Sequence, residues 1–291
     1  MELVVVRDRQ GQVFVYEDAC PHKRVRLSQF GRRQGNTLVC GYHGWKFETN
    51  SGKCTEIPGM PALHTKFCLR SYPVKRYGGW VWAFPGDPEL ADQRPLPVIP
   101  PAHDRRYHPI PMEGAVNCHF SYMTENATDL FHADLHRSQQ PWANPRLESL
   151  ESDDRTVVAR YEVDAPRLLA ALIGQRGKNY IRITYEYPYF HLQSEDGAFY
   201  LFVTYVPTGA QSIWVHSTFY FRHVWGMPWI LRLLHPLLDW GTFRQVFHQD
   251  IRAVEEEQRA YNLSGCDRSR ETNPVSHAVR NVILHQCASG S

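Results

Sequence analysis

The stretch CPHKRVRLSQFGRRQGNTLVCGYH, residues 20–43, carries two short pairs of metal-binding residues separated by a polar spacer. Each pair joins one cysteine to one histidine: Cys20 with His22, and Cys40 with His43. A Cys2His2 zinc finger usually has its two cysteines in one pair and its two histidines in the other. A [2Fe–2S] cluster with two thiolates on one iron and two imidazoles on the other needs one ligand of each kind from each loop. The mixed pairs therefore favour such a cluster, with these four residues as ligands, over zinc.

The flanking residues predict an all-β domain around the two loops. Pro21 would stiffen the first loop, and Gly41 and Gly44 allow a tight second loop. From ELVVVRD at the N-terminus to WVWAFP at residues 80–85, short β-branched and aromatic runs alternate with turns. A proline-rich segment, RPLPVIPP, then indicates a boundary, which we place between residues 1–95 and 96–291.

This first domain resembles the Rieske domain of the Rieske non-heme iron oxygenases. The motifs CPHKRVRLS, CGYHGWKFETNSGKC, IPGM and GGWVWAFPGDP occur in the order typical of that family. Respiratory Rieske proteins carry an extra disulfide between the loops, and neither loop has a second cysteine here. Because the chain opens within a strand pattern, we expect the domain to lack its first strand.

Composition argues against several other classes of protein. The net charge is only +2 over 291 residues, so we expect no nucleic-acid binding. Seven cysteines without a signal sequence argue against a disulfide scaffold and for a cytoplasmic protein. No apolar run reaches the length of about 18 residues that a membrane span needs. The most apolar run, residues 224–243, is expected to be buried or to line a pocket, with a membrane-surface helix as the alternative.

A second metal site is indicated in the other half of the chain. Residues 117–137 contain no proline or glycine and predict a helix, on which Asp129, His132 and His136 would share one face. Two imidazoles one turn apart suit a first-row metal. Helical histidine pairs are more often ordinary surface or core residues, so the pair gains its weight from the iron–sulfur domain that precedes it.

The third ligand of a two-histidine, one-carboxylate site is expected on a helix over residues 243–261. Asp250 lies there in an otherwise apolar stripe, and a buried carboxylate needs a partner such as a metal ion. His248 would point to another side of the helix, and Glu257, two turns further along the stripe, is the alternative ligand. An Asp250 ion pair within the core is the non-metal alternative.

The resemblance to the family extends to this second half. The sequence D-x-x-H-x-x-x-H from Asp129 to His136 is similar to the family's mononuclear iron motif. The resemblance implies that His132, His136 and Asp250 bind Fe(II), and that Asp129 bridges to His43 of a neighbouring subunit. It implies a head-to-tail homotrimer, in which one subunit's cluster serves the next subunit's iron. It also implies an α+β chain, in which a helix-grip domain of antiparallel sheet and helices follows the all-β Rieske domain.

The expected activity is the hydroxylation or demethylation of a small organic molecule with O2 and externally supplied electrons. The chain has no GxGxxG or flavin-binding signature, so we expect a separate ferredoxin, an NAD(P)H-dependent reductase, or both. A basic first loop would suit an acidic donor, although it would equally fit a solvated surface: Lys23, Arg24, Arg26, Arg32 and Arg33. The short catalytic segment resembles the single-subunit monooxygenase branch. The alternatives are a ring-hydroxylating dioxygenase that forms cis-diols and an electron carrier with an inactive second domain.

Overall fold

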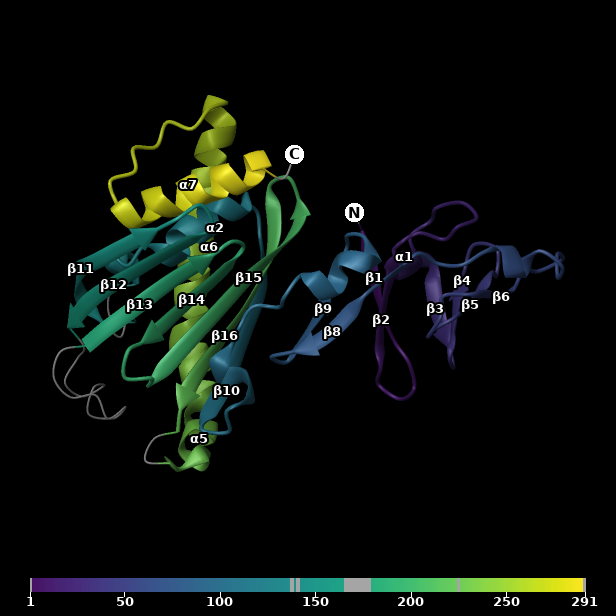
Figure 1. Ribbon diagram of the computed structural model, residues 1–291, viewed down its shortest axis with the longest axis horizontal. Coiled ribbons are helices and arrows are strands. Elements are labelled where there is room, and N and C mark those ends of the chain that lie inside the picture. The colour runs from purple at the N-terminus through teal and green to yellow at the C-terminus, as the bar shows by residue number, and fades with distance from the viewer. Residues whose placement is uncertain (1, 137–138, 140–141, 165–178, 224–225, 290–291) are drawn as a thin grey trace. The chain divides into compact units, whose positions relative to one another are not determined.

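A computed structural model describes residues 2–136, 139, 142–164, 179–223 and 226–289 (Figure 1). The chain divides into two compact units, Met1–Val98 and Ile99–Ser291. Each unit has a hydrophobic core of its own. Among the described residues, no helix is long and apolar enough to cross a membrane.

The first unit is built from short antiparallel strands. One sheet has the order β3–β4–β5–β6, with bounds Gly31–Gln34, Thr37–Cys40, Lys46–Glu48 and Cys54–Glu56. A second sheet has the order β1–β2–β7, with bounds Leu3–Arg7, Val13–Glu17 and Ser71–Tyr72. Strands β8 (Val74–Tyr77) and β9 (Trp80–Ala83) form a separate pair. Its helical turns are short: α1 (Leu27–Phe30), η1 (His64–Lys66) and η2 (Pro88–Gln93). The predicted all-β domain is confirmed.

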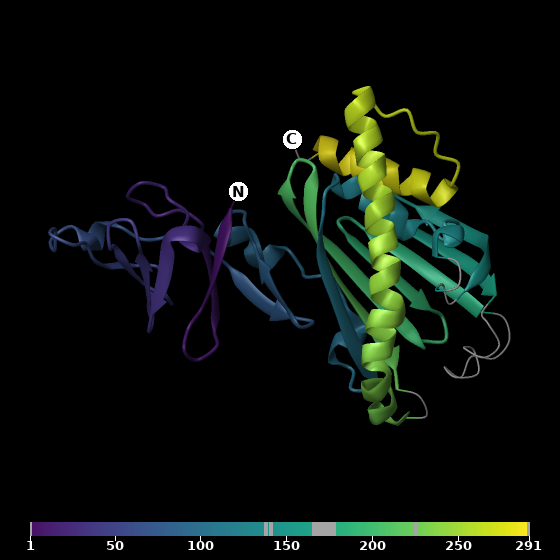
Figure 2. The ribbon, with the colours of Figure 1, turned by 180° about the vertical axis from the view of Figure 1, so that it is seen from behind.

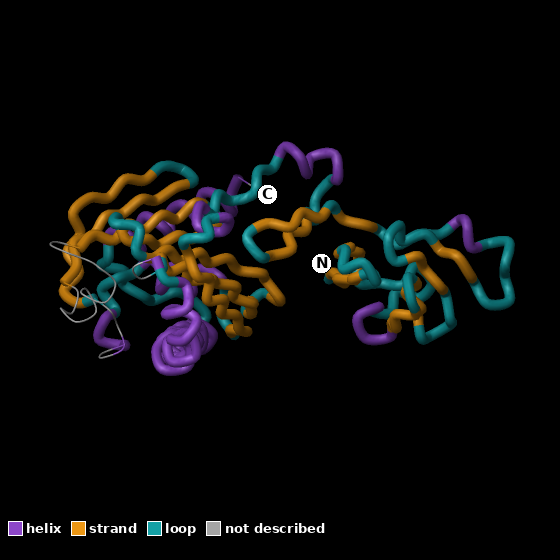
Figure 3. Tube along the Cα trace, turned by 90° about the horizontal axis from the view of Figure 1, so that it is seen from below, coloured by secondary structure: helices purple, strands orange, loops and turns teal. Residues whose placement is uncertain are grey.

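The second unit is one seven-stranded antiparallel sheet with helices on one face (Figures 1 and 2). Its strand order is β10–β16–β15–β14–β13–β12–β11. The strands, in that order, are Tyr107–Val116, Ser212–Arg222, Phe199–Gly209, Tyr189–Ser194, Asn179–Glu186, Thr156–Asp164 and Ala143–Ser152. Helices α2 (Phe120–Thr128), α6 (Arg244–Ser264) and α7 (Pro274–Ser289) cover it, and α6 is seen nearly end-on in Figure 3. The predicted arrangement of antiparallel sheet and helices is confirmed, although β10, β11 and α7 were not expected.

Strict alternation along the strands explains which face carries the helices. In β12, every second residue from Val157 to Val163 is buried, as a period-two strand with one covered face requires. Helix α7 meets this face with apolar residues that recur at helical spacing: Val275, Val279, Val282 and Ile283. From α6, Val254 enters the same core and is fully buried. Helix α6, which carries Asp250, is thus packed against the sheet.

The apolar run at residues 224–243 forms α5 (Pro228–Leu238) and a π-helical turn, η6 (Asp239–Phe243). The expectation that this run is buried or lines a pocket is wrong for one face of the helix. Leu231 is 5% exposed, whereas Trp229, Leu233 and Trp240 are 59%, 73% and 71% exposed. A run that is apolar on all sides can bury only the side that meets the protein. Residues 224 and 225 lie outside the described residues.

Candidate functional site

The two loops of the first unit repeat one pattern of backbone hydrogen bonds. Cys20 O accepts from Arg24 N at 2.8 Å, and Cys20 N donates to Val25 O at 2.9 Å. The second loop makes the same two bonds, four and five residues after Cys40, at 2.9 Å each. The residue four places after each cysteine has left-handed backbone, with φ of 60° at Arg24 and 72° at Gly44. Glycine adopts this conformation without cost, which explains its place in the second loop.

These loops bring the four predicted cluster ligands together. Cys20 and Cys40 are each 1% exposed, while the His22 and His43 rings are exposed and their centroids lie 4.4 Å apart. Burial, together with a hydrogen bond to the Cys40 thiol, raises the pKa of Cys20 to about 11. Trp45 stacks on the His22 ring at 4.9 Å and 7° between planes. Two buried thiols beneath two surface imidazoles are the donor set that a Rieske cluster takes, because a bound iron replaces the thiol protons.

In the second unit, the predicted continuous helix over residues 117–137 is wrong. Helix α2 ends at Thr128, Asp129 has extended backbone, and a separate short helix α3 (Ala133–His136) follows. Asp129 Oδ1 accepts a hydrogen bond from Phe131 N at 2.7 Å, which replaces the helical bond and turns the chain. The three motif residues therefore do not share one helical face. Residue 137 lies outside the described residues.

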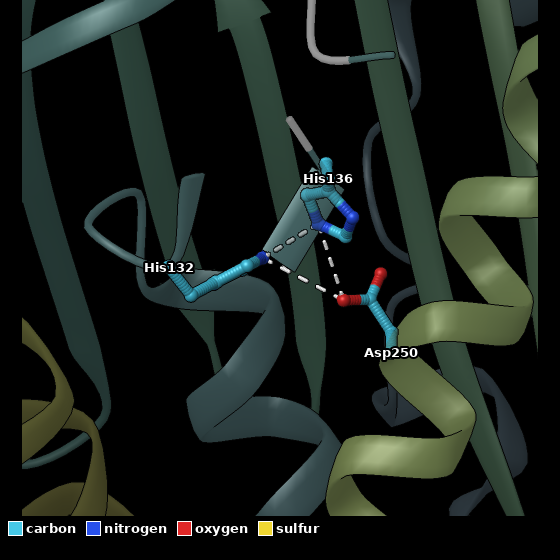
Figure 4. A group of neighbouring side chains, drawn as sticks. All are labelled: His132, His136 and Asp250. Atoms are coloured by element: carbon cyan, nitrogen blue, oxygen red, sulfur yellow. Dashed lines mark hydrogen bonds and ion pairs between the residues drawn. The ribbon is translucent and has the colours of Figure 1, made fainter. Parts of the chain in front are cut away.

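The turn nevertheless aims both histidines at α6. His132 Nε2 lies 2.9 Å from His136 Nε2, and Asp250 Oδ1 lies 3.6 Å and 3.3 Å from the two nitrogens (Figure 4). Within the described residues, these three side chains form the one group of at least three possible ligands close enough to share a metal ion. The prediction of a helix around residues 243–261 is accurate, and that helix supplies the carboxylate.

The donor set fits a six-coordinate metal ion. Neighbouring ligands at bonds of about 2.1 Å lie about 3 Å apart in an octahedron, close to the observed separations. Asp250 Oδ1 is buried and has no hydrogen-bond partner among the residues that the structure describes. Burial lowers the pKa of His132; burial also opposes protonation of His136, but the Asp250 carboxylate outweighs it and raises the pKa of His136. An otherwise unsatisfied buried carboxylate beside two imidazoles is the arrangement that a bound cation stabilises.

Residues that the sequence did not indicate hold these ligands in place. His136 Nδ1 donates to Gln249 Oε1 at 2.9 Å, which leaves Nε2 directed at the site. Gln249 Nε2 in turn donates to Gln139 Oε1 at 2.9 Å. Asn273 Nδ2 donates to Asp129 Oδ1 at 2.8 Å, and Asn273 Oδ1 accepts from Val275 N at the start of α7. The bonds of Gln249 and the bond from Asn273 to Asp129 join segments more than a hundred residues apart, and no local spacing reveals them.

Helix α6 also anchors the start of α2. Glu255 Oε1 accepts hydrogen bonds from Asn117 N and Nδ2 at 2.9 Å, and Gln258 Oε1 accepts from His119 N at 2.8 Å. Gln258 is 4% exposed, so its bond is protected from water. One helix therefore carries the carboxylate, orients a histidine and fixes the segment that presents both histidines.

The two other α6 residues considered as ligands lie outside this group. Neither His248, which is exposed, nor Glu257 belongs to the cluster of possible ligands in the described residues. Glu257 lies near a different charged group, in which Arg280 binds Glu125 at 2.6 Å. Tyr122 and Glu125 of α2 also lie in or near this second group.

Comparison with known proteins decides the family. Residues 1–73 match the family model of the Rieske [2Fe–2S] domain. The 4β-methylsterol monooxygenase of Methylococcus capsulatus is 34% identical over an alignment of 307 residues. The alignment covers 98% of this chain and 81% of that protein. The chain belongs to the Rieske non-heme iron oxygenases. Its cofactors are accordingly a [2Fe–2S] cluster and a mononuclear iron, and it is an O2-dependent oxidoreductase.

Solved structures of oxygenases share the fold of this Rieske oxygenase. Dicamba monooxygenase bound to 3,6-dichlorosalicylic acid superposes with a TM-score of 0.81 at 20% identity, covering 99% of this chain and 91% of that one. The oxygenase of carbazole 1,9a-dioxygenase, solved with its ferredoxin, gives a TM-score of 0.70 at 19% identity, covering 98% and 82%. The methylsterol monooxygenase, aligned over 98% of this chain, agrees with hydroxylation or demethylation of a small organic molecule. Neither the dioxygenase nor the electron-carrier alternative is favoured by these matches.

Proposed function

We propose that this Rieske oxygenase is a monooxygenase whose mononuclear iron is held by His132, His136 and Asp250. One observation carries the assignment. The two imidazoles, from α3 and from the turn before it, converge on a buried oxygen of the Asp250 carboxylate on α6, and this oxygen has no hydrogen-bond partner among the described residues. When bound, the iron supplies O2 activation, and the cluster supplies single electrons. A pure electron carrier would have no need for this convergent group.

The cluster ligands in this proposal are Cys20, His22, Cys40 and His43. The repeated loop geometry and the burial of both thiols support it. The imidazoles lie at the surface of the unit, where an electron donor or acceptor can approach within hydrogen-bond distance. Because the thiols are buried and the imidazoles are exposed, electrons would enter and leave through the histidine side.

Asp129 is proposed to connect the iron site to the cluster of a neighbouring subunit. Asn273 Nδ2 and Phe131 N both donate hydrogen bonds to the Asp129 carboxylate, three residues before His132. These two bonds hold the carboxylate in one position. His43 of the partner subunit would donate the bridging hydrogen bond to the Asp129 carboxylate. This arrangement requires a head-to-tail ring, and we propose a homotrimer. Light scattering that gives the mass of a monomer for the fully active enzyme would refute it.

A separate electron donor is part of the proposal. The chain lacks a nucleotide-binding glycine motif, and the similar carbazole 1,9a-dioxygenase oxygenase forms a complex with a ferredoxin. We propose that this chain also receives electrons from a ferredoxin or a related reductase. Reduction of the cluster should therefore need added donor protein, and NAD(P)H alone should leave it oxidised.

For the substrate, we propose an apolar ring compound, and a 4β-methylated sterol is the first to test. The monooxygenase of Methylococcus capsulatus, which matches 98% of this chain, is named for oxidation of such a sterol. Incubation with the sterol, reduced ferredoxin and O2, followed by mass spectrometry, should give a product with one added oxygen atom. An unchanged sterol, with a cis-diol formed from an arene instead, would favour the dioxygenase alternative.

The test of the iron site itself is EPR spectroscopy of the dithionite-reduced protein after addition of nitric oxide. We expect a Rieske signal together with a high-spin iron–nitrosyl signal. His132→Ala should abolish the nitrosyl signal and keep the Rieske signal, whereas Cys20→Ser should do the reverse. His248→Ala is the matched control, because this exposed histidine lies on α6 outside the group. A nitrosyl signal that survives in His132→Ala and Asp250→Ala would refute the ligand assignment.

A further inference from the structure

Helix α5 and the π-helical turn η6 that follows it expose an apolar strip, called the α5 strip below. Trp229, Leu233, Pro236 and Trp240 are spaced by four, three and four residues, which places them on one side of a helix. All four are exposed, and Leu233 reaches 73%. The side that meets the protein is apolar as well, with Leu231 at 5% exposure. A surface helix of an ordinary globular protein carries polar residues on its outer side, so this strip requires an apolar partner.

A basic groove borders this strip. It is lined by α5 and by the neighbouring ends of β10 and β16, and its charged residues are Arg105, Arg106, Arg222, His223 and Arg232. None of the described residues that line the groove is acidic. Arg106 pairs with Asp104, outside the lining, at 2.6 Å, and the Arg222 guanidinium donates to the backbone oxygen of Asp196 at 2.8 Å. The groove therefore carries a net positive charge.

We propose that the α5 strip and its basic groove form a docking face for the surface of an anionic phospholipid bilayer. The chemistry of the two parts matches the two layers of such a surface. Trp229 and Trp240, near the two ends of the strip, would lie at the headgroup level, where indole rings concentrate, and Leu233 between them would enter the acyl boundary. The arginines of the groove would bind the lipid phosphates.

The pairing of apolar and cationic surface favours a bilayer over a protein partner. Helix α5 carries most of the strip, and its Pro228 and Arg232 also line the basic groove, so the two kinds of surface adjoin. Arg232 is exposed beside Leu233 on α5. Arg244, at the start of α6, lies 5.3 Å from the centre of the Trp240 ring and pairs with Asp239 at 2.9 Å. Because no described helix can span a membrane, the contact would be peripheral. The inference goes beyond the proposed activity and does not depend on the substrate.

The test uses the full-length protein with both cofactors and unilamellar vesicles in a flotation assay. We expect the protein to float with vesicles of phosphatidylcholine and phosphatidylglycerol, less with phosphatidylcholine alone, and less as salt is raised. Leu233→Asn should lower the partition coefficient about tenfold, and Arg232→Gln about fivefold on anionic vesicles only. Leu263→Asn is the matched control, since Leu263 is 75% exposed elsewhere on α6, and it should not change partitioning.

A second measurement, fluorescence quenching by brominated lipid, tests the contact without relying on a variant that binds less. Phosphatidylcholine brominated on its acyl chains, mixed into the anionic vesicles, should quench part of the tryptophan fluorescence, and a Trp229→Phe, Trp240→Phe double variant should lose that quenching while it keeps the Rieske EPR signal. Failure of the wild-type protein to float, equal binding to both vesicle types, or an equal loss in Leu263→Asn would overturn the proposal. A change in the mass of the native assembly for Leu233→Asn would also overturn it, because it would show that a second copy of the chain covers the strip.

Discussion

Gln249 offers a sharp test of how the iron site is held, because it touches a proposed ligand without being one. His136 is 4% exposed, and its Nδ1 proton is donated to Gln249 Oε1 at 2.9 Å. In Gln249→Leu, iron would fix Nε2 of this ring and leave the Nδ1 proton buried without an acceptor. The metal-free ring can turn to another partner, so the cost falls on the iron-bound state.

The size of this effect follows from the buried hydrogen bond. An unsatisfied buried donor costs about 1–3 kcal/mol, which corresponds to a loss of iron affinity of about fivefold to about 150-fold. Loss of outer hydrogen bonds to metal-ligating histidines elsewhere costs about 10- to 100-fold, in the same range. The assay is competition with a chelator for the mononuclear iron, followed by the nitrosyl EPR signal. The Rieske signal of the same sample serves as the internal standard.

The matched control is Gln245→Leu, one turn earlier on α6. Gln245 is exposed, and it bonds to Gln139 at the outer end of the same chain of amides. Its loss should change iron affinity by less than about twofold, as for surface substitutions in general. Iron affinity of Gln249→Leu within twofold of wild type, or equal losses in both variants, would refute the argument that Gln249 orients His136.

Three further substitutions test other parts of the chain. Arg280→Met should destabilise the second unit by about 3 kcal/mol in thermal unfolding, because it leaves the largely buried Glu125 carboxylate unpaired, and adding Glu125→Gln should restore part of the loss. Burial lowers the pKa of His191 to about 4, so stability present above pH 6.5 should fall by about 2–4 kcal/mol as the pH drops to 4. His191→Gln, which keeps a partner for the Tyr200 hydroxyl, should flatten that fall; an unchanged acid profile would contradict it. Cys40→Ser should remove the Rieske absorbance and leave iron binding by the second unit intact, whereas loss of both would show that the two sites are not independent.

Local sequence patterns predicted those parts of the structure that local interactions determine. Short β-branched and aromatic runs predicted the all-β first unit, and the spacing of Cys20, His22, Cys40 and His43 indicated a pair of loops, which the backbone bonds show. Asp250 was selected because a carboxylate in an apolar stripe needs a partner, and the structure brings two imidazoles to it. In each case, the signal lies within one turn or one strand.

Features set by distant contacts could not be predicted in the same way. The break after Thr128 depends on Asp129 accepting a bond from Phe131 N and on Asn273, 144 residues further along, fixing that carboxylate. The absence of proline and glycine made a continuous helix the natural expectation, and a side-chain bond overrode it. Gln249 gave no signal because a glutamine on a helix is usually a solvated residue.

The exposure of one side of the apolar run at residues 224–243 also could not be read from local sequence, because it depends on which side of the helix meets the protein. The position of this run links the proposed docking face to the iron site. Helices α5 and α6 join through the π-helical turn, where Asp239 N and Arg244 N continue the helical hydrogen bonds (Figure 2). Ten residues separate Trp240 from Asp250, or about 15 Å along the helix at 1.5 Å per residue. A bilayer held at Trp240 would therefore lie within about one leaflet's thickness of the iron carboxylate. An apolar substrate could then pass from lipid to the site with little exposure to water, which would avoid the unfavourable transfer of its apolar surface into water.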